Sequence, residues 1–496
     1  MFRALLLAPL LVAFTSFTHA TVPAGELQRR WNALAKELPD TAILVLLPAQ
    51  HAVRSRDVDW PYRQDNDVVY YTGATLPDSG LILVKDRGET TSVVVTKTPD
   101  PVFAVWEGDI PDAKSVREAT GADLVITHSD KDRFLRTLTS GLFWEEERTY
   151  RRSMNAPSFP GVYEALKDGE LTLWLDLGRF RSTQSAEESQ ALEFAREVRG
   201  SFPEIEVRDA STALIAARSV KSDWELERMR EVIDITTDAQ IAIMKRAPSV
   251  SHEYQLEATL EYVFRDSGAC CPSFPSIVAA GRNATILHYG ENNDPIDDDA
   301  LVLVDIGAEK DFYAADVTRT FPRSGVFTEP QREIYEAVLD AQSAVMEQVR
   351  PGVFHRELTE TAIDVLGKHL LKLGLISENT EEQVKVYFMH GLGHGLGMDV
   401  HDDLDYTAPL EQGHVFTIEP GLYIRKDDAL ANAVFADLDE ETIRVLSETL
   451  DRYDGIGVRI EDDVAVTRRG YELLSDGAPR TINEIEALMA SEGLAE

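Results

Sequence analysis

Short hydrophobic runs separated by helical stretches dominate the chain from about residue 22 to residue 207. A run of four to eight mostly apolar residues, bounded by turn-forming residues, is typical of a strand buried on both faces of a sheet. Five segments have this pattern, at residues 42–49, 80–86, 91–98, 123–128 and 172–178. Because helical stretches lie between them, they predict an α/β domain.

The pattern changes near residue 210. Ser222-Asp223-Trp224-Glu225 has the arrangement of a capping box, with Ser222 as the cap of a helix whose apolar residues then recur at helical spacing. We therefore predict one domain over residues 21–210 and a second over residues 211–496.

In the second domain, long helical stretches alternate with strand-like segments. One helix is predicted to begin at Thr328, with Pro330 tolerated in its first turn. The strand-like segments carry acidic residues and lie at 301–308, 311–321, 414–423 and 457–467. This alternation of helices and strand-like segments predicts an α+β fold, in which an antiparallel sheet carries the functional residues and helices cover the sheet.

Four carboxylates and one imidazole lie at the edges of these strand-like runs: Asp305, Asp316, His394, Glu419 and Glu461. A single acidic residue near a strand end is usually exposed. Burying an unpaired carboxylate costs several kcal/mol, whereas two divalent cations would balance four carboxylates. The set therefore predicts a dinuclear metal site. Oxygen-rich sites with one imidazole suit Mn(II), Fe(II), Co(II) or Zn(II).

Histidines gather in the same half of the chain. His288, His390, His394 and His401 lie in the two short segments 284–293 and 389–402. A lone histidine is more often structural than catalytic, but in the second segment four glycines alternate with other residues and permit close backbone approach. A phosphate-binding loop is the competing interpretation. It fails because no lysine and serine follow the glycines.

Composition and charge narrow the possible partners. The chain has 496 residues, 44% hydrophobic content and a net charge of −37, which is compatible with two or three globular domains. Such a charge argues against a nucleic acid or an anionic membrane as partner. A surplus of acidic residues ordinarily lies on the solvated surface of a protein.

Residues 1–20 predict a secretory signal. One basic residue, Arg3, precedes an apolar stretch, and small residues precede a cut after Ala20. The apolar stretch is short for a permanent membrane anchor, and a buried N-terminal helix is the alternative. We therefore expect an exported protein, periplasmic or secreted, without a membrane anchor.

The two cysteines, Cys270 and Cys271, are adjacent. A bridge between neighbours closes a strained ring, so we expect no structural disulfide. Zinc binding is not expected either, because no second thiol pair is present.

These segments together resemble a known family. The sequences ILHYGENN (286–293), VDIGAE (304–309), ADVTRTFP (315–322), MHGLGHGLGMDVHD (389–402), TIEPGLY (417–423) and GVRIEDDVAVT (457–467) are similar, in order, to motifs of the pita-bread metallopeptidases. The segment 59–84 resembles the N-terminal domain of aminopeptidase P. The chain is thus identified as resembling the proline-specific branch, which contains aminopeptidase P and prolidase.

The resemblance implies a C-terminal pita-bread (creatinase/aminopeptidase) catalytic domain behind an N-terminal creatinase-like α/β domain. It implies that Asp305 binds one metal and that Asp316 and Glu461 bridge both. His394 and Glu419 would complete the first metal's ligands, and Glu419 would also shuttle the proton.

The remaining candidates also take their roles from the resemblance. His288 and His401 would contact the substrate and the developing oxyanion, His390 would support the pocket edge, and Arg459 would brace the metal-binding carboxylates. A metal-bridging hydroxide would attack the carbonyl before proline in a proline-containing peptide. The implied cofactor is two divalent ions, Mn(II) first, with Co, Fe or Zn as alternatives. A homo-oligomer, dimer or tetramer, is the corresponding assembly.

Several alternatives remain open from the sequence. The long segment 426–455 resembles an insertion of prolidases, in which extra structure restricts substrates to dipeptides, so an Xaa-Pro dipeptidase is the second candidate. Methionine aminopeptidases lack such an N-terminal domain, and creatinase-like hydrolases lack the metals. Non-enzymatic pita-bread binding modules typically lose ligands, whereas this sequence keeps the full set.

Overall fold

The fold is that of a computed structural model. It describes residues 22–102, 104–142, 144, 158–178, 190–436 and 438–491. The predicted signal segment, residues 1–20, lies outside the described residues. Among the helices within the described ranges, none combines the length and the apolar character needed to cross a bilayer.

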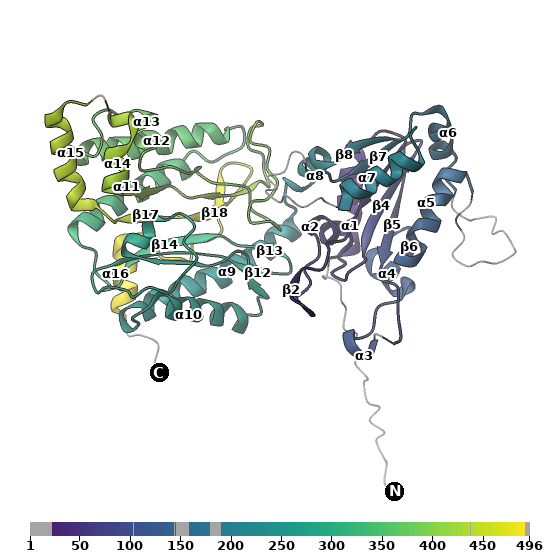
Figure 1. Cartoon of the computed structure of the whole chain (residues 1–496), viewed down its shortest axis with the longest axis horizontal. Helices are drawn as coiled ribbons and strands as arrows, with labels where there is room; N and C mark the ends of the chain where they lie inside the picture. Colours follow the sequence, from purple (N-terminus) through teal and green to yellow (C-terminus); the bar gives the residue numbers. More distant parts are fainter. Residues whose placement is uncertain are drawn as a thin grey trace, which may run out of the picture. The chain divides into compact units, whose positions relative to one another are not determined.

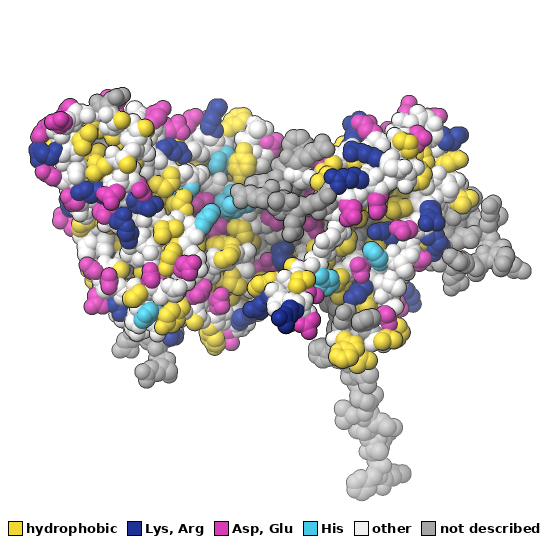
Figure 2. Space-filling view, in the orientation of Figure 1, with side chains coloured by type: hydrophobic (Ala, Val, Ile, Leu, Met, Phe, Trp, Pro, Cys, Tyr) yellow, Lys and Arg dark blue, Asp and Glu magenta, His cyan; other side chains and the backbone are white. Residues whose placement is uncertain are grey.

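The chain divides into two compact units, Met1–Leu214 and Ile215–Glu496. Charged side chains of both signs are interspersed over the face shown in Figure 2, and the acidic ones do not gather in one patch. On this face the acidic side chains are therefore dispersed and exposed to solvent.

Unit 1 is built on a six-stranded sheet in the order β6-β5-β4-β1-β7-β8. Its strands are β1 (Ala42–Leu46), β4 (Gly80–Asp86), β5 (Glu89–Thr96), β6 (Leu124–Thr127), β7 (Thr172–Leu175) and β8 (Glu206–Asp209). The first five coincide with the hydrophobic runs of the sequence. The sequence did not predict β8, because its residues are alternately exposed and half-buried and form no apolar run.

The sheet of unit 1 is mixed. Its centre, β5-β4-β1, is antiparallel, while β6 joins β5 and the pair β7-β8 joins β1 in parallel. Buried aromatic side chains extend its core: Phe134 packs edge-on against Trp144 and Phe159, with ring centroids 5.2 and 6.0 Å apart.

Helices and one hairpin complete unit 1. They are α1 (Ala24–Lys36), the hairpin β2 (Val53–Ser55) and β3 (Val58–Asp59), α2 (Asn66–Thr72), α3 (Ala104–Glu107), α4 (Ala113–Thr120), η1 (His128–Asp130), α5 (Lys131–Ser140), α6 (Pro160–Asp168) and α7 (Gln190–Ser201). Helix α8 (Ser211–Arg218) spans the division between the units.

Unit 2 has helices on both sides of its strands. Figure 1 shows α9, α10 and α16 on one side, and α11, α12, α13 and α15 on the other. The helices are α9 (Asp223–Arg246), η2 (Ala247–Ser249), α10 (Glu253–Asp266), η3 (Gly281–Thr285), α11 (Glu329–Met346), α12 (His355–Leu373), α13 (Glu381–Val384), α14 (Lys426–Ala431), η4 (Ala433–Phe435), α15 (Glu440–Tyr453) and α16 (Ile482–Ala490).

Local sequence explains where the long helices start. The predicted capping box at α9 is present: the Glu225 N–H donates to Ser222 Oγ at 3.3 Å, and the Ser222 N–H donates to Glu225 Oε2 at 3.0 Å. At α11, the Thr328 N–H donates to the Gln331 side chain at 2.9 Å. These contacts satisfy N–H groups that a helix start otherwise leaves without partners.

The strands of unit 2 form small, mostly antiparallel sheets in the orders β10-β11-β14, β13-β12-β9, β15-β18-β19 and β16-β17. They are β9 (Cys271–Pro272), β10 (Ile277–Ala280), β11 (Leu301–Ile306), β12 (Ala308–Lys310), β13 (Tyr313–Ala314), β14 (Val317–Pro322), β15 (Val415–Ile418), β16 (Gly421–Tyr423), β17 (Gly457–Arg459), β18 (Asp462–Val466) and β19 (Tyr471–Leu473).

The cysteine prediction is wrong. The structure joins Cys270 and Cys271 in a disulfide between sequence neighbours. Strand pairing holds both residues in place, because the Cys270 N–H donates to Glu309 O at 2.9 Å and Cys271 is registered opposite Glu309. Oxidised sulfurs offer no thiolate to a metal, although Glu309 lies close to both of them.

Candidate metal centre and active site

Antiparallel pairing brings Asp305 and Asp316 together. Asp305 lies near the end of β11, and Asp316 immediately precedes β14, whose register sets Asp305 opposite Thr318. The connection between the strands is tight at Gly307, where an added Cβ would lie 1.7 Å from Ala315 O. Only glycine permits this close approach of the two backbones.

Glu419 and Glu461 meet through a second antiparallel pair. Ile418, the last residue of β15, is registered opposite Asp462, the first residue of β18. The Glu461 N–H donates to Thr318 O at 3.1 Å, and the Thr318 hydroxyl donates to Glu461 Oε2 at 2.6 Å. These bonds connect the two strand pairs, so the four carboxylates converge.

The glycine-rich segment supplies His394. Its Nδ1 lies 3.1 Å from Gly395 O, which can only accept, so Nδ1 carries the proton and Nε2 has a free lone pair. That Nε2 faces two carboxylates, at 3.4 Å from Asp316 Oδ2 and 3.6 Å from Glu419 Oε1. A carbonyl on one ring nitrogen and a free second nitrogen is the usual state of a metal-binding histidine.

The residues present fit divalent metal ions. Asp305 Oδ1 and Asp316 Oδ1 are buried without a hydrogen-bond partner. Ligand atoms of Asp316, His394 and Glu461 all lie within 4.8 Å of one another. Buried oxygens left without donors are costly unless a cation binds them.

Electrostatics point the same way. Burial, followed by repulsion from Asp305, raises the pKa of Asp316 well above its usual range. Burial and then the charge of Asp316 raise the pKa of Glu461 similarly. The pKa of Glu419 is also raised, mainly by burial, against the opposing effect of His394. Each shift expresses the cost of ionised carboxylates that a bound cation would remove.

Arg459 lies behind the carboxylates. One of its guanidinium nitrogens donates to Asp305 Oδ2 at 2.6 Å, and another donates to the Tyr423 hydroxyl oxygen at 2.8 Å. The Tyr423 O–H is 2.8 Å from His390 Nε2, and His390 Nδ1 is 2.7 Å from Gly391 O. Because that carbonyl only accepts, His390 donates from Nδ1 and accepts from Tyr423. Burial lowers the pKa of His390 to about 3, so the imidazole is neutral.

The other two candidate histidines, His288 and His401, line the same cavity as the carboxylates. The rings of His394 and His401 have centroids 4.0 Å apart. Burial and then the charge of His394 lower the pKa of His401 to about 4, so its imidazole is neutral at neutral pH. His288 lines the cavity beside Tyr289, whose hydroxyl donates to the buried Glu253 at 2.8 Å.

All the sequence-predicted site residues line one cavity of about 900 Å³, within the range of small-ligand pockets. They are Asp305, Asp316, His394, Glu419, Glu461, His288, His390, His401 and Arg459. Apolar and aromatic residues also line this cavity: Phe274, Pro275, Ile277, Leu287 and Tyr289.

The long segment after Glu419 lies elsewhere. None of its described residues, 426–436 and 438–455, is among those that line the cavity. Its helix α15 buries Leu446, Leu450 and Tyr453, and the Tyr453 hydroxyl donates to Glu333 of α11 at 2.7 Å. The segment therefore packs on the outside of a helix.

Several supporting residues were missed by sequence reasoning. Tyr423 fixes His390, and Glu253 accepts hydrogen bonds from Tyr289, Asn283 and the backbone of Ala280 and Asp294. Thr318 and Arg319 are fully buried in β14, and Arg319 donates to Glu461 O at 2.6 Å. The run of polar residues inside the apolar strand VTRTF was the available signal. Glu253 gave none, because it begins an ordinary amphipathic helix.

Comparison with known proteins agrees with this geometry. Metallopeptidase family M24 matches residues 227–468, and the aminopeptidase P N-terminal domain matches residues 27–142. The Xaa-Pro aminopeptidase of Escherichia coli K12 is 33% identical over 94% of this chain and 98% of its own length. The chain belongs to the aminopeptidase P family of M24 metallopeptidases. The predicted enzyme class, a metallo-aminopeptidase, is confirmed, as is the predicted family.

Solved structures agree on the fold of the enzyme. Aminopeptidase PepP of Pseudomonas aeruginosa has a TM-score of 0.76 and 34% identity, covering 95% of this chain and 99% of its own. Escherichia coli aminopeptidase P, solved with the inhibitor Pro-Leu, has a TM-score of 0.76 and 30% identity, with the same coverage. The predicted fold class is therefore confirmed. Human Xaa-Pro aminopeptidase 3 is a more distant relative, 30% identical over 88% of this chain and 78% of its own length.

Removal of divalent metal should abolish activity, and added Mn(II) should restore it. Asp316 and Glu461 have raised pKa values in the absence of metal, so metal binding should displace their protons. The apparent affinity for the metal should therefore decrease as the pH is lowered. The same raised pKa values affect stability. Because such a carboxyl binds its proton more tightly in the folded chain than in the unfolded chain, the free energy of unfolding of the metal-free enzyme should increase as the pH is lowered through the folded pKa. Calorimetric titration in two buffers of different ionisation enthalpy measures the protons. A pH-independent affinity would contradict the assignment.

Proposed function

We propose that the enzyme is an exported Xaa-Pro aminopeptidase with two divalent metal ions, Mn(II) in the native state, which releases the first residue from peptides longer than two residues. The observation that carries the proposal is that the converging carboxylates and His394 line the same cavity as a group of apolar side chains. The printed names of the relatives support the substrate class.

The shape of a prolyl substrate suits this cavity. Proline has no N–H and a fixed φ, so a site for it needs apolar surface rather than a backbone acceptor. Phe274, Leu287 and Tyr289 offer such surface beside the metal candidates. The Pro-Leu inhibitor of the Escherichia coli relative carries the same ring.

The position of the insertion favours longer peptides over dipeptides. Restriction to dipeptides needs structure that closes the substrate cavity beyond the proline. The described residues of the segment 426–455 pack on α11 through Tyr453 and Arg452, and they do not line the cavity. An Xaa-Pro dipeptidase remains the second candidate, because insertion length favoured it.

The proposed ligands of the metals are Asp305, Asp316, His394, Glu419 and Glu461. When bound, two such cations supply a water nucleophile that is ionised at neutral pH, and they polarise the scissile carbonyl. Glu419 is the proposed proton shuttle. Its carboxylate lines the cavity beside the other proposed ligands, and it would take up the proton of the nucleophile and deliver it to the departing prolyl nitrogen.

His288 and His401 are the proposed donors to the oxyanion that develops on the carbonyl. A neutral imidazole donates one N–H without adding a positive charge beside the cations. His401 meets this requirement, since its pKa is lowered to about 4. His390 and Arg459 hold the network at the cavity edge through Tyr423.

The decisive assay compares an Xaa-Pro dipeptide with an Xaa-Pro-Xaa tripeptide, with Mn(II) present. Cleavage of the tripeptide is expected, with release of the first residue and with kcat lowered at least about 100-fold in His401→Ala. An exposed substitution on α12, Leu371→Ala, is the matched control and should leave kcat unchanged. Cleavage of the dipeptide alone would establish the dipeptidase instead.

Export is proposed from residues 1–20. A basic residue, a short apolar stretch and small residues before Ala20 support it. Expression of the full chain in a Gram-negative host, with N-terminal sequencing of the periplasmic fraction, is expected to give a mature chain that starts at Thr21. Recovery of only the uncut chain with the cytosolic fraction would refute export.

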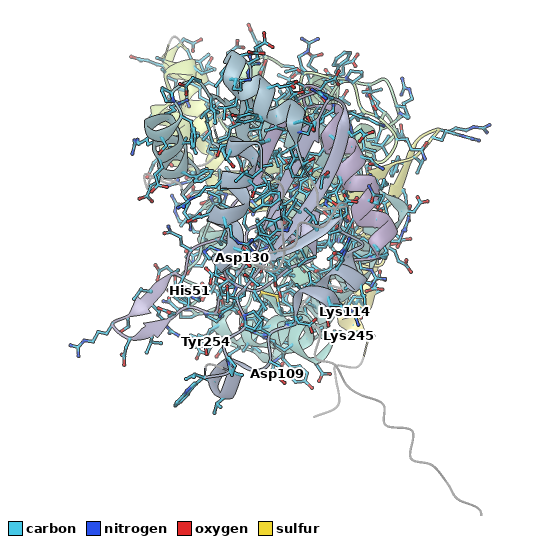
Figure 3. The ribbon with its side chains drawn as sticks, turned by 90° about the vertical axis from the view of Figure 1, so that its right-hand side faces the viewer. His51, Asp109, Lys114, Asp130, Lys245 and Tyr254 are labelled. Atoms are coloured by element: carbon cyan, nitrogen blue, oxygen red, sulfur yellow. A yellow bond between two sulfur atoms is a disulfide. The ribbon has the colours of Figure 1, made fainter. Side chains whose placement is uncertain are left out.

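A homo-oligomer, dimer or tetramer, is proposed from exposed apolar side chains of unit 1. Trp106 and Val105 are 83% and 85% exposed, and the β2–β3 hairpin carries the exposed Val53 and Val58. Figure 3 shows this hairpin, next to the labelled His51, projecting from the rest of its unit. Large exposed apolar groups are typical of surfaces that become covered.

Light scattering after size-exclusion chromatography tests the assembly. The wild-type mass is expected to be a multiple of the chain mass, and Trp106→Asp should shift the enzyme toward smaller species, because a charge opposes burial of that surface. Leu371→Asp, also at an exposed apolar position, is the control and should keep the assembly. A monomeric wild type would contradict the proposal.

A further inference from the structure

The segment from His394 to Asp402 closes on itself. The Asp402 N–H donates to Gly395 O at 2.8 Å, and these two residues form an antiparallel bridge. The closure brings the first histidine of the segment, His394, beside His401, with ring centroids 4.0 Å apart. The position of His401 therefore depends on the conformation of the residue that follows it.

Asp402 is held by two buried cations. Its Oδ1 accepts from the Arg218 guanidinium at 2.7 Å, and its Oδ2 accepts from Lys221 Nζ at 2.9 Å. All three side chains are no more than 2% exposed. Lys221 Nζ also donates to Arg218 O at 3.1 Å. We call this set the Arg218–Lys221–Asp402 clamp.

The clamp is packed without spare room. An added Cβ at Gly397 would lie 1.7 Å from Asp402 Oδ2 and 3.0 Å from Lys221 Cε. The Lys221 N–H donates to Gly413 O at 2.9 Å, and the Ala314 N–H donates to Gly397 O at 2.8 Å. Gly397 therefore allows the ion pair to form, and the segment is tied to the hairpin that precedes Asp316.

Stability alone does not explain such a clamp. Removing buried charges from water costs several kcal/mol each, and apolar side chains of similar volume often stabilise a fold as well or better. What charges add is a fixed geometry, because each hydrogen bond constrains distance and direction. The segment constrained in this way carries His401, which faces the cavity.

We propose that Asp402, held by Arg218 and Lys221, is a positioning residue that fixes His401 for transition-state stabilisation. The inference rests on the proposed oxyanion role of His401. Asp402 touches neither substrate nor metal in this account, and it acts through the backbone of the segment. Loss of the clamp lets His401 shift while His394 remains anchored by Thr417, whose hydroxyl accepts from the His394 N–H at 3.1 Å.

The test compares Asp402→Asn with Asp399→Asn in the full-length enzyme, with saturating Mn(II) and an Xaa-Pro-Xaa substrate. Asp399 also pairs with Arg218, at 2.9 Å, but its side chain is 48% exposed, so it is the matched control. For Asp402→Asn, kcat is expected to fall about 10- to 100-fold, as for a small misplacement of a reacting group. KM and bound metal per chain should stay at the wild-type values, and Asp399→Asn should resemble the wild type.

A general loss of folding would give a different result. It would lower the amount of active, metal-loaded enzyme and would move metal content together with kcat. Lys221→Met provides a second measurement, since it keeps the Arg218–Asp402 pair and should lower kcat less, again without a change in KM. If Asp402→Asn does not fold, Lys221→Met decides alone. A kcat within about twofold of wild type in the deciding variant, or a kcat loss that follows metal loss, overturns the proposal.

His401→Ala is measured in the same assay. If His401→Ala is impaired and Asp402→Asn is not, the oxyanion role stands and only the positioning role is overturned. If the wild type cleaves no Xaa-Pro peptide, the proposed function fails and the positioning role fails with it. If His401→Ala is fully active, the oxyanion role of His401 and the positioning role of Asp402 both fail, while the aminopeptidase activity stands.

Discussion

One constraint governs the catalytic unit: its buried carboxylates lie close together and repel one another. Asp305, Asp316, Glu419 and Glu461 share a small volume, and burial together with their own charges raises the pKa of Asp316 and Glu461 well above the usual range. Such a group is stable only if cations balance it and rigid backbone holds it. Antiparallel strand pairs provide the rigidity, because register fixes which residues stand opposite one another.

Hydrogen-bond donors of the protein offset only part of the electrostatic cost of burying these carboxylates. Arg459 donates to one oxygen of Asp305, and Thr318 donates to Glu461. Two other oxygens of the group, Asp305 Oδ1 and Asp316 Oδ1, are buried and have no donor within the described fold. Selective satisfaction of this kind distinguishes a metal-binding site from a structural ion pair such as Arg319–Asp462, which is fully buried and fully paired.

In the glycine-rich segment, too, a buried carboxylate is balanced by cations. Glycine at 395 and 397 lets Asp402 approach, and two buried cations hold its carboxylate. This ion pair therefore contributes to the conformation of the segment, together with the burial of Leu396 and Met398. The insertion at 426–455 is stabilised differently, by packing of Leu450 and Tyr453 against the outside of the fold, and none of its described residues lines the cavity.

The sequence by itself determined the strands of unit 1 with long apolar runs, the capped helix starts and the set of metal-binding candidates, because each has a local signal: periodicity, a cap, or an acid beside an apolar run. It missed β8, an edge strand without such a run, and it misjudged Cys270 and Cys271. Only tertiary structure decided the contacts between distant segments, such as Tyr423 with His390, Glu253 with Tyr289, and Lys221 with Asp402. Their partners are selected by strand register and chain crossing, and no local pattern encodes either one.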